Sequence, residues 1–279
     1  MYNIEKQTIY AVVIWYNPTE DMVRNILTYH SDIGGTIVVD NSVDSHESYL
    51  KGLKNITYLS NGSNLGIAAA QNRGIEEAIR KNAKYVLTMD QDSHFGEDSF
   101  ESYIEKCNQC DIPNVGIFAP VHVELDKSKY PDYKDVTDVM ASGSLMSVAD
   151  FQLIGPFRED FFIDMVDCEY CCRMRKYGKR VITVFAIRLN HHLGNGICHT
   201  KMFNKHYLDH PVWRYYYMER NILELMRLYP EEKEYYKKAN FKRLKRMYLY
   251  DTHHKFAKIR MTILGWWHYK RHKFGQLDM

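Results

Sequence analysis

Short apolar runs alternate with helix-like stretches over residues 8–92, and this alternation constrains the fold more than any other feature. β-Branched and aromatic residues dominate the runs, as is typical of buried strands. The stretches at 21–29 and 67–81 have the apolar spacing or the small residues of helices. Strands that alternate with helices predict an α/β fold with a mostly parallel, Rossmann-like sheet flanked by helices. The four expected strands are 8–16, 36–39, 56–59 and 85–89.

Polar groups follow each of the four expected strands. Parallel sheets bind ligands beyond the carboxyl ends of their strands, where such groups meet. Two carboxylates at one strand end suit a hard divalent cation, and such a cation suits a diphosphate. Residues that favour turns explain a polar group after one strand, but turns do not require polar groups after all four strands. The groups are Asn17, Asp40, Asn64 with Gly66, and Asp90 with Asp92.

The stretch 64–74 links the third expected strand to a helix. Gly66 and the three alanines that follow allow a backbone or a ligand to approach the helix N-terminus closely, where free N–H groups favour phosphate. The stretch is neither a Walker loop nor a GxGxxG fingerprint. Tight packing of the helix on the sheet is the alternative interpretation.

The stretch 155–173 places several carboxylates at the start of an expected helix that closes near Gly178. Asp164 and Asp167 lie one helical turn apart, and either could take a proton as a general base. Glu169 and Arg173 have the i, i+4 spacing of a structural ion pair. The alternative is a solvated acidic helix start that the helix dipole favours.

Two histidines and two arginines complete the candidate set. His191 and His192 follow an expected strand at 181–187, and imidazole suits a divalent metal or a phosphate oxygen. A surface turn is the alternative for this pair. Arg214 and Arg220 lie on an expected helix, where they could meet a diphosphate or serve as ordinary surface cations.

Several ordered motifs together resemble the nucleotide-sugar half of the family 2 glycosyltransferases, which have the GT-A fold. The resemblance covers roughly residues 8–225, and Trp15 departs from the small hydroxyl residue that many relatives carry there. The sequence around Asp90 is most similar to bacterial rhamnosyltransferases of O-antigen and cell-wall rhamnan synthesis. The motifs are Val12-Val13-Ile14-x-Tyr16-Asn17, Val39-Asp40-Asn41-Ser42, Asn64-x-Gly66-Ile67-Ala68 with Asn72-x-Gly74, and Met89-Asp90-Gln91-Asp92-Ser93.

The resemblance implies a role for each candidate. Asp92 and His191 would bind Mg2+ or Mn2+, with His192 in reserve, and Asp167 would be the catalytic base. Val166 and Glu169 replace the usual acidic neighbours of that base. Asp40 would recognise the nucleotide base, and Asp90 would face the ribose or the metal shell. The remaining expected donor-site residues are Tyr16, Asn17, Asn64, Gly66, Asn72, Ser142, Gly143, Arg214 and Arg220.

The C-terminal part of the chain differs in charge from the rest. Residues 231–279 hold 13 Lys/Arg and 5 Asp/Glu, interleaved with aromatic residues, whereas the whole chain has a net charge of +2. We therefore expect a glycosyltransferase domain at 1–229 and a basic helical region at 230–279. A basic, aromatic helix fits an anionic membrane surface. The alternatives are packing in a homodimer and nucleic acid, and we expect no nucleic acid because no recognised binding module accompanies the tail.

Other features indicate where the protein is located and whether its cysteines are reduced. The N-terminus lacks a signal peptide and no run of about 20 apolar residues occurs, so we expect a cytoplasmic protein, peripheral at the inner face of the cell membrane. Six cysteines without a signal peptide predict reduced thiols. The Cys107-x-x-Cys110 and Cys168-x-x-Cys171 pairs make a zinc site a minor alternative.

The expected activity follows from the resemblance. It implies an inverting transfer of L-rhamnose from dTDP-L-rhamnose to a hydroxyl of a lipid-diphosphate-linked saccharide, in the synthesis of a bacterial surface polysaccharide. One alternative keeps the fold and uses another nucleotide hexose, such as UDP-galactose or UDP-glucose. A second alternative is a noncatalytic subunit that binds a nucleotide sugar.

Overall fold

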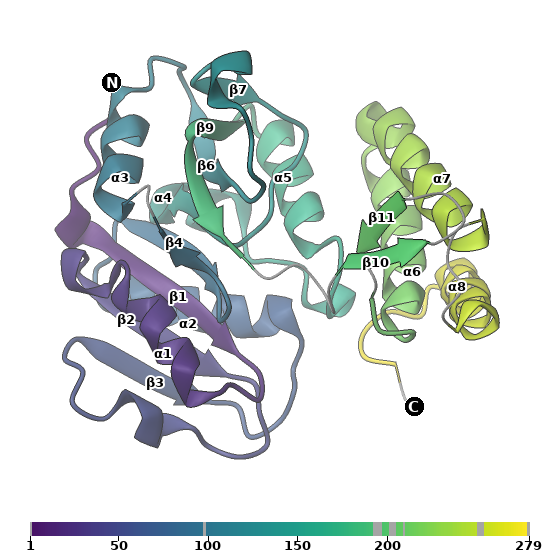
Figure 1. The fold of residues 1–279 in the computed structure, drawn as a ribbon, viewed down its shortest axis with the longest axis horizontal. Helices are drawn as coiled ribbons and strands as arrows, with labels where there is room; N and C mark the ends of the chain where they lie inside the picture. Colours follow the sequence, from purple (N-terminus) through teal and green to yellow (C-terminus); the bar gives the residue numbers. More distant parts are fainter. Residues whose placement is uncertain are drawn as a thin grey trace.

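A nine-stranded mixed sheet organises the protein, with helices on both of its faces (Figure 1). The computed structural model describes residues 2–96, 99–191, 197–200, 205–208, 210–249 and 254–277. The strand order is β3-β2-β1-β4-β8-β6-β9-β5, and β7 pairs with β9. The strands are β1 (Ile9–Trp15), β2 (Gly35–Asp40), β3 (Ile56–Ser60), β4 (Tyr85–Asp90), β5 (His94–Phe95), β6 (Val115–Val121), β7 (Tyr133–Asp135), β8 (Ser144–Ser147) and β9 (Arg180–Asn190).

The first four strands form the parallel half of the sheet, as the sequence predicts. In the central strand β1, Val13 pairs with Val38 of β2 and with Met89 of β4. Because these strands run in one direction, their carboxyl ends lie at a single edge of the sheet. The polar residues that follow the strands therefore meet at that edge.

The second half of the sheet is mixed, so the expectation of a mostly parallel sheet holds best for the first four strands. Strand β8 lies between β4 and β6 and runs antiparallel to both. Strand β9 is parallel to β6, whereas β5 and β7 are antiparallel to β9. A separate two-stranded sheet consists of β10 (Ile197–Thr200) and β11 (Lys205–Leu208).

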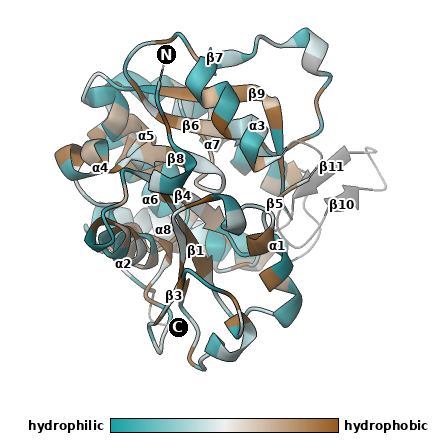
Figure 2. Cartoon of the chain, turned by 90° about the vertical axis from the view of Figure 1, so that its left-hand side faces the viewer, coloured by the Kyte–Doolittle hydropathy of each residue, from teal (hydrophilic) through white to brown (hydrophobic). Residues whose placement is uncertain are grey.

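The alternation of side chains along β1 divides the core between the two faces of the sheet. Val12 and Ile14 pack with α2 and α5, while Val13 and Trp15 pack with α1 and α3. Figure 2 shows apolar strands inside a more hydrophilic layer of helices. The flanking helices are α1 (Val23–Leu27), α2 (Ile67–Arg80), α3 (Phe100–Gln109), α4 (Val148–Ile154) and α5 (Val166–Lys176).

This division of the core excludes the zinc site that the two Cys-x-x-Cys pairs suggest. Cys107 and Cys110 lie in the cluster around α3, and Cys171 lies in the cluster around α5, on the other face of the sheet. All five described cysteines are free, as the sequence predicts, and burial raises the pKa of the Cys107 and Cys171 thiols.

Three long helices form the C-terminal end of the molecule, beside the edge of the sheet (Figure 1). Helix α8 (Lys255–Lys270) packs along α6 (Arg214–Leu228), and α7 (Lys233–Leu249) contacts both. The chain then returns to the sheet domain, where Gly275 N–H donates to the Asp160 carbonyl at 2.7 Å. The division at residue 229 stays a prediction, since α6 packs with both parts. None of the helices in the described ranges is long and apolar enough to cross a membrane.

Candidate active site

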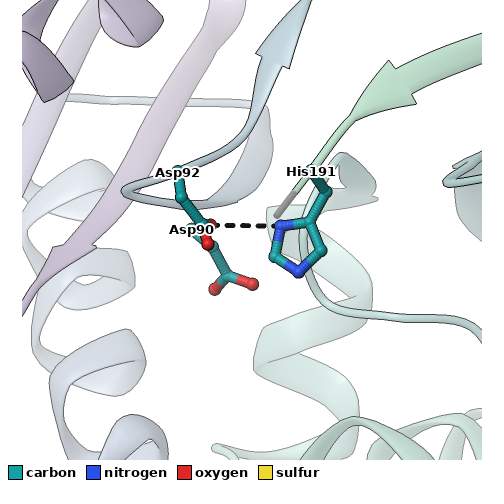
Figure 3. Close-up of side chains that lie close together, drawn as sticks. All are labelled: Asp90, Asp92 and His191. Carbon is teal, nitrogen blue, oxygen red and sulfur yellow. Dashed lines mark ion pairs between the residues drawn. The ribbon is translucent and has the colours of Figure 1, made fainter. Parts of the chain in front are cut away.

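Two carboxylates and an imidazole meet at the carboxyl edge of the sheet (Figure 3). Asp90 is the last residue of β4, Asp92 lies in the turn that follows, and His191 comes directly after β9. Strands β4 and β9 are not neighbours in the sheet. The short strand β5, which follows the turn, pairs His94 with Asn190 and so brings the end of β9 beside Asp92.

The spacing of these three groups fits a divalent cation. Their candidate ligand atoms all lie within 4.8 Å of one another, and no other His/Cys/Asp/Glu trio in the described part of the chain does so. His191 Nδ1 lies 3.1 Å from Asp92 Oδ1. Adjacent ligands of an octahedral ion at 2.0–2.1 Å are about 3 Å apart. Two carboxylates and one imidazole suit Mg2+ or Mn2+, so these residues fit the expected metal.

The electrostatics of the group agree with a cation site. Burial raises the pKa of Asp90 and the nearby Asp92 adds to this, while His191 and Arg214 oppose it. Burial acts to lower the pKa of His191, but the carboxylates of Asp92 and Asp90 outweigh it and raise that pKa. Asp90 is therefore a buried carboxylate beside a second carboxylate, and a divalent cation would offset this negative charge. His191 would bind such a cation as the neutral imidazole.

The Ser142 side chain hydrogen-bonds to the backbone of Asp90 and to Ser93. Its side chain is fully buried, and its Oγ accepts a hydrogen bond from Asp90 N–H at 3.1 Å. The same hydroxyl donates to Ser93 Oγ at 2.7 Å, and Ser93 Oγ lies 2.7 Å from His191 Nδ1. The Ser142 hydroxyl is therefore engaged within the protein, and a direct contact of Ser142 with the donor stays a prediction.

Gly143 also has a structural role, and its contact with the donor stays a prediction. Its φ of +79° is unfavourable for other residues, and a Cβ there would lie 2.6 Å from Cγ of Pro120. Its N–H donates to the Thr88 carbonyl at 2.8 Å, and its carbonyl accepts from Tyr103 Oη at 2.9 Å. Gly143 thus lets the chain turn tightly into β8 beside β4.

His122 is a site residue that the sequence analysis misses. Its Nε2 donates to the Ser142 carbonyl at 2.8 Å, and its ring lies 5.9 Å from that of His191. Burial lowers the pKa of His122 to about 4, so the ring is neutral at neutral pH. His122 directly follows β6, and the strand-end criterion used for the first four strands would have found it.

Hydrogen bonds connect the residues that follow β1, β2 and β4. Tyr16 N–H donates to Gln91 Oε1 at 2.8 Å, and the Tyr16 carbonyl accepts from Gln91 Nε2 at 3.3 Å. Asn17 has a φ of +46°, and its N–H donates to Ser42 Oγ at 2.7 Å. The Tyr16 side chain is half exposed, so it stays available to a ligand.

Asp40 organises the loop that follows β2. The side chain is fully buried; its Oδ1 accepts from Ser42 N–H at 2.9 Å, and its Oδ2 accepts from Tyr58 Oη at 2.7 Å. His46 Nδ1 also lies 2.8 Å from Oδ2. These hydrogen bonds lower the pKa of Asp40 although burial acts in the opposite direction. A contact with a base requires the loop to give up one of these bonds, and it stays a prediction.

The loop 64–66 is packed against the protein's own backbone. Asn64 Oδ1 accepts from Gly66 N–H at 3.0 Å. Gly66 has a φ of +86°, and a Cβ there would lie 2.6 Å from the Phe162 carbonyl oxygen. Ile67 N–H donates to that same carbonyl at 2.8 Å. The N-terminus of α2 therefore binds a peptide carbonyl of the loop before α5.

Asn72 connects α2 to the loop 157–159 through hydrogen bonds. Its Nδ2 donates to the Phe157 carbonyl and to Glu159 Oε1, both at 2.9 Å, and its Oδ1 accepts from Phe157 N–H. The residue is only 2% exposed. Its amide is therefore engaged inside the protein, and its contact with the donor stays a prediction.

Asp167 lies in the first turn of α5 and is partly buried. Its Oδ1 accepts from Cys168 N–H at 2.8 Å, and it lines a small, largely apolar cavity with Thr88, Phe157 and Tyr170. This burial raises the pKa of Asp167 to about 6. A carboxylate with such a pKa is well suited to accept a proton near neutral pH.

Asp164, the rival base, is engaged in an ion pair with Arg214. The pair is bidentate, with Nη2–Oδ1 and Nε–Oδ2 distances of 2.5 and 3.2 Å, and the Asp164 side chain is 6% exposed. The positive charge of Arg214 also acts on Asp167 and Asp90. Arg214 therefore acts electrostatically on both the candidate base and Asp90, and of the two rival bases Asp167 has no ion pair within the described part of the chain.

The loop before Asp167 has an unusual backbone, and α6 holds it in place. Phe162, Asp164 and Met165 all have a positive φ, between 61° and 65°. Such values are unfavourable for residues other than glycine and persist where the surroundings fix them. Asn221 Nδ2 donates to the carbonyls of Phe161, Ile163 and Asp164, at 3.0, 2.8 and 2.9 Å.

Arg220 holds the same loop, and its contact with the donor stays a prediction. The side chain is fully buried, and its Nη2 donates to the carbonyls of Asp160 and Phe161. Its Nη1 donates to the Gly275 carbonyl at 2.7 Å. The guanidinium thus links the loop before α5 to the C-terminal segment.

His192, the reserve metal ligand, lies outside the described residues.

Comparisons with known proteins agree with the geometry. The fold is that of a GT-A glycosyltransferase: S. aureus TarS 1-349 in complex with UDP-GlcNAc has a TM-score of 0.59 at 12% identity, over 95% of this chain and 81% of that one. The structure of GalNAc-T7 with UDP, GalNAc and Mn2+ gives 0.56 at 11% identity, over 68% of this chain and only 44% of its own length.

Sequence relatives identify the family. Residues 11–179 match the model of glycosyl transferase family 2, and the chain belongs to this family. It is 30% identical to the dTDP-rhamnosyl transferase RfbF of Shigella flexneri over 78% of this chain and 80% of that protein. It is 25% identical to the low-salt glycan biosynthesis hexosyltransferase Agl10 of Haloferax volcanii over 59% of this chain and 61% of that protein. The chain is therefore a glycosyltransferase.

Proposed function

We propose that the protein transfers L-rhamnose from dTDP-L-rhamnose to an acceptor hydroxyl, in the synthesis of a bacterial surface polysaccharide. The observation that carries this proposal is the grouping of Asp90, Asp92 and His191 at the carboxyl edge of the sheet, within reach of the charge of Arg214. The identity of 30% to a dTDP-rhamnosyl transferase supports rhamnose as the sugar.

Each group at the edge has a proposed task in the reaction. Asp92 and His191 would hold Mg2+ or Mn2+, with Asp90 as a third ligand or a ribose contact. When bound, such an ion would supply positive charge next to the departing nucleoside diphosphate. Arg214 adds positive charge beside the same leaving group. Tyr16, Asn17 and Asn64, at the ends of β1 and β3, line the nucleotide side of the site.

Asp167 acts as the general base in a single displacement. Its carboxylate takes the proton of the acceptor hydroxyl as the acceptor oxygen bonds to C1 of the sugar. The bond between C1 and the diphosphate oxygen breaks in the same step, so dTDP leaves and the anomeric configuration inverts. A positioned carboxylate of this kind accelerates the reaction by about 10²–10⁴-fold. The pKa of about 6 keeps Asp167 ionised at neutral pH yet basic enough to bind the proton.

The proposed acceptor is a lipid-diphosphate-linked saccharide at the inner face of the cell membrane. The excess of basic residues in 231–279 supports a working position close to an anionic surface. A peripheral enzyme would meet such an acceptor without crossing the membrane.

A donor panel tests the proposed function. The purified enzyme is incubated with Mg2+ or Mn2+, a synthetic lipid-diphosphate-linked saccharide, and either dTDP-rhamnose, UDP-glucose or UDP-galactose. We expect turnover of dTDP-rhamnose well above that of both UDP-sugars. Turnover of a UDP-sugar without turnover of dTDP-rhamnose would contradict the assignment of rhamnose. Donor binding without transfer to any acceptor hydroxyl would favour a noncatalytic subunit.

A further inference from the structure

Helix α8 presents an apolar stripe on the side that faces away from α6. Phe256, Ile263 and Trp267 are 87%, 59% and 38% exposed, and their i, i+7, i+11 spacing places them on one helical face. The opposite face is buried, with Lys258, Thr262 and Gly265 covered by the neighbouring helices. The stripe is therefore the part of α8 that stays exposed to solvent when the opposite face packs against the neighbouring helices.

Basic residues border this stripe. Arg260 and Lys270 are exposed on either side of it, and the Arg271 guanidinium lies over the Trp267 ring, 3.9 Å from its centroid. The sequence of α8 contains no Asp or Glu. An apolar centre with a cationic margin is the composition of helices that lie in the interface of an anionic bilayer.

Helix α7 carries a second face of the same kind. Phe241 and Tyr248 are 67% and 63% exposed, and each directly follows a buried residue, so both lie about 100° around α7 from the buried Asn240 and Met247. The exposed lysines of α7 include Lys237, Lys238, Lys242 and Lys245, and its single acidic residue is Glu234 at its start. Both helices lie at the end of the molecule remote from β3 (Figure 1).

We propose that these exposed faces of α7 and α8 dock the enzyme on the anionic surface of a bilayer. The aromatic and aliphatic side chains enter the boundary between headgroups and acyl chains, and the lysines and arginines meet the lipid phosphates. This docking deepens the proposed function, on which it rests for the lipid-linked acceptor. It does not depend on which sugar is transferred.

The charge and the apolar side chains of the two faces argue against a symmetric dimer and against nucleic acid as the binding partner. A symmetric dimer through the same faces places basic residues against basic residues, which is unfavourable. Nucleic acid satisfies the cations and stacks on aromatic rings, but it offers no apolar phase for the exposed Ile263. An anionic membrane satisfies both the charge and the apolar side chains.

Vesicle sedimentation with the full-length enzyme tests the docking. The vesicles contain phosphatidylcholine alone or phosphatidylcholine with phosphatidylglycerol. We expect binding to the anionic vesicles only, weakened by salt. The triple variant Phe256→Ser, Ile263→Ser, Trp267→Ser should bind about tenfold more weakly or worse. A matched control, Leu27→Ser with Leu153→Ser, removes exposed apolar residues of α1 and α4 and should bind like the wild type.

Three outcomes would overturn the docking. The first is equal binding to both kinds of vesicle, and the second is unchanged binding of the triple variant. The third is no vesicle binding together with a dimer, detected by analytical ultracentrifugation, that the triple variant dissociates. Transfer to a water-soluble acceptor, measured on the same samples, separates this proposal from the proposed function. We expect the triple variant to keep it, and loss of docking with transfer intact leaves the catalytic assignment standing.

Discussion

Replacement of Asp167 by Asn should stabilise the protein at neutral pH while it removes the catalytic base. Burial beside Thr88, Phe157 and Tyr170 raises the pKa of Asp167 from 3.8 to about 6 in the folded protein. The folded state therefore prefers the protonated carboxyl, and the charged form is a cost to stability. An amide has no charge to bury and can still accept the Cys168 N–H bond.

The magnitude follows from the pKa shift. A raised carboxyl pKa favours folding below the unfolded-state value, and this advantage is lost as the pH rises through the folded value. One pKa unit corresponds to about 1.4 kcal/mol, so ionised Asp167 costs about 3 kcal/mol at pH 7. At pH 5 the folded carboxyl is mostly protonated, and the cost is about half as large. The Asn variant should therefore gain up to about 3 kcal/mol at pH 7 and about half of that at pH 5.

Urea unfolding of the wild type and of Asp167→Asn, at pH 5 and at pH 7, measures this difference. Asp111→Asn, in the exposed turn after α3, controls for a general effect of removing a negative charge. An Asn variant that is less stable than the wild type at pH 7 would refute the reasoning. A gain that does not change between pH 5 and pH 7 would also refute it, since the gain would not come from ionisation.

Three further substitutions test the site and its support. Asp92→Asn should weaken Mn2+ binding about tenfold or more, because the site loses a charged ligand; titration followed by electron paramagnetic resonance measures it, and unchanged affinity would place the metal elsewhere. Asn221→Ala leaves three carbonyls of the loop before α5 without their donor, so we expect a loss of about 2–4 kcal/mol in urea unfolding and a lower kcat; an unchanged kcat of the folded fraction would contradict the positioning role. Gly66→Ala should lower the free energy of unfolding by about 1–3 kcal/mol, owing to the φ of +86° and the nearby Phe162 carbonyl; a change below about 0.5 kcal/mol would show that the loop adapts.

The sequence predicts the parallel half of the fold and the acidic pair because both depend on local patterns. Strand periodicity places β1 to β4, and the carboxyl-edge rule then brings Asp90 and Asp92 to one place. The resemblance adds His191, which the sheet delivers through the pairing of β5 with β9. The antiparallel insertion of β8 is not predictable from periodicity, because alternation is the same for either strand direction.

Several predicted donor-site residues bond to neighbours that are distant in sequence. Asn72 and Arg220 have the chemistry of donor ligands, but their partners lie about 60 to 90 positions away, so only the tertiary fold shows that they bond to the loop 157–161. Ser142 is a related case, because its hydroxyl reaches Asp90 N–H from behind. Polar residue type identifies the neighbourhood of a site, and burial decides which residues can face a ligand.

The most direct test of the account is the rate of rhamnosyl transfer by Asp167→Asn, measured beside its affinity for dTDP-rhamnose in the presence of Mg2+ or Mn2+. The account predicts donor binding within a fewfold of the wild type and transfer slower by about 10²–10⁴-fold. Wild-type transfer by this variant would contradict the account, because the base would then lie elsewhere.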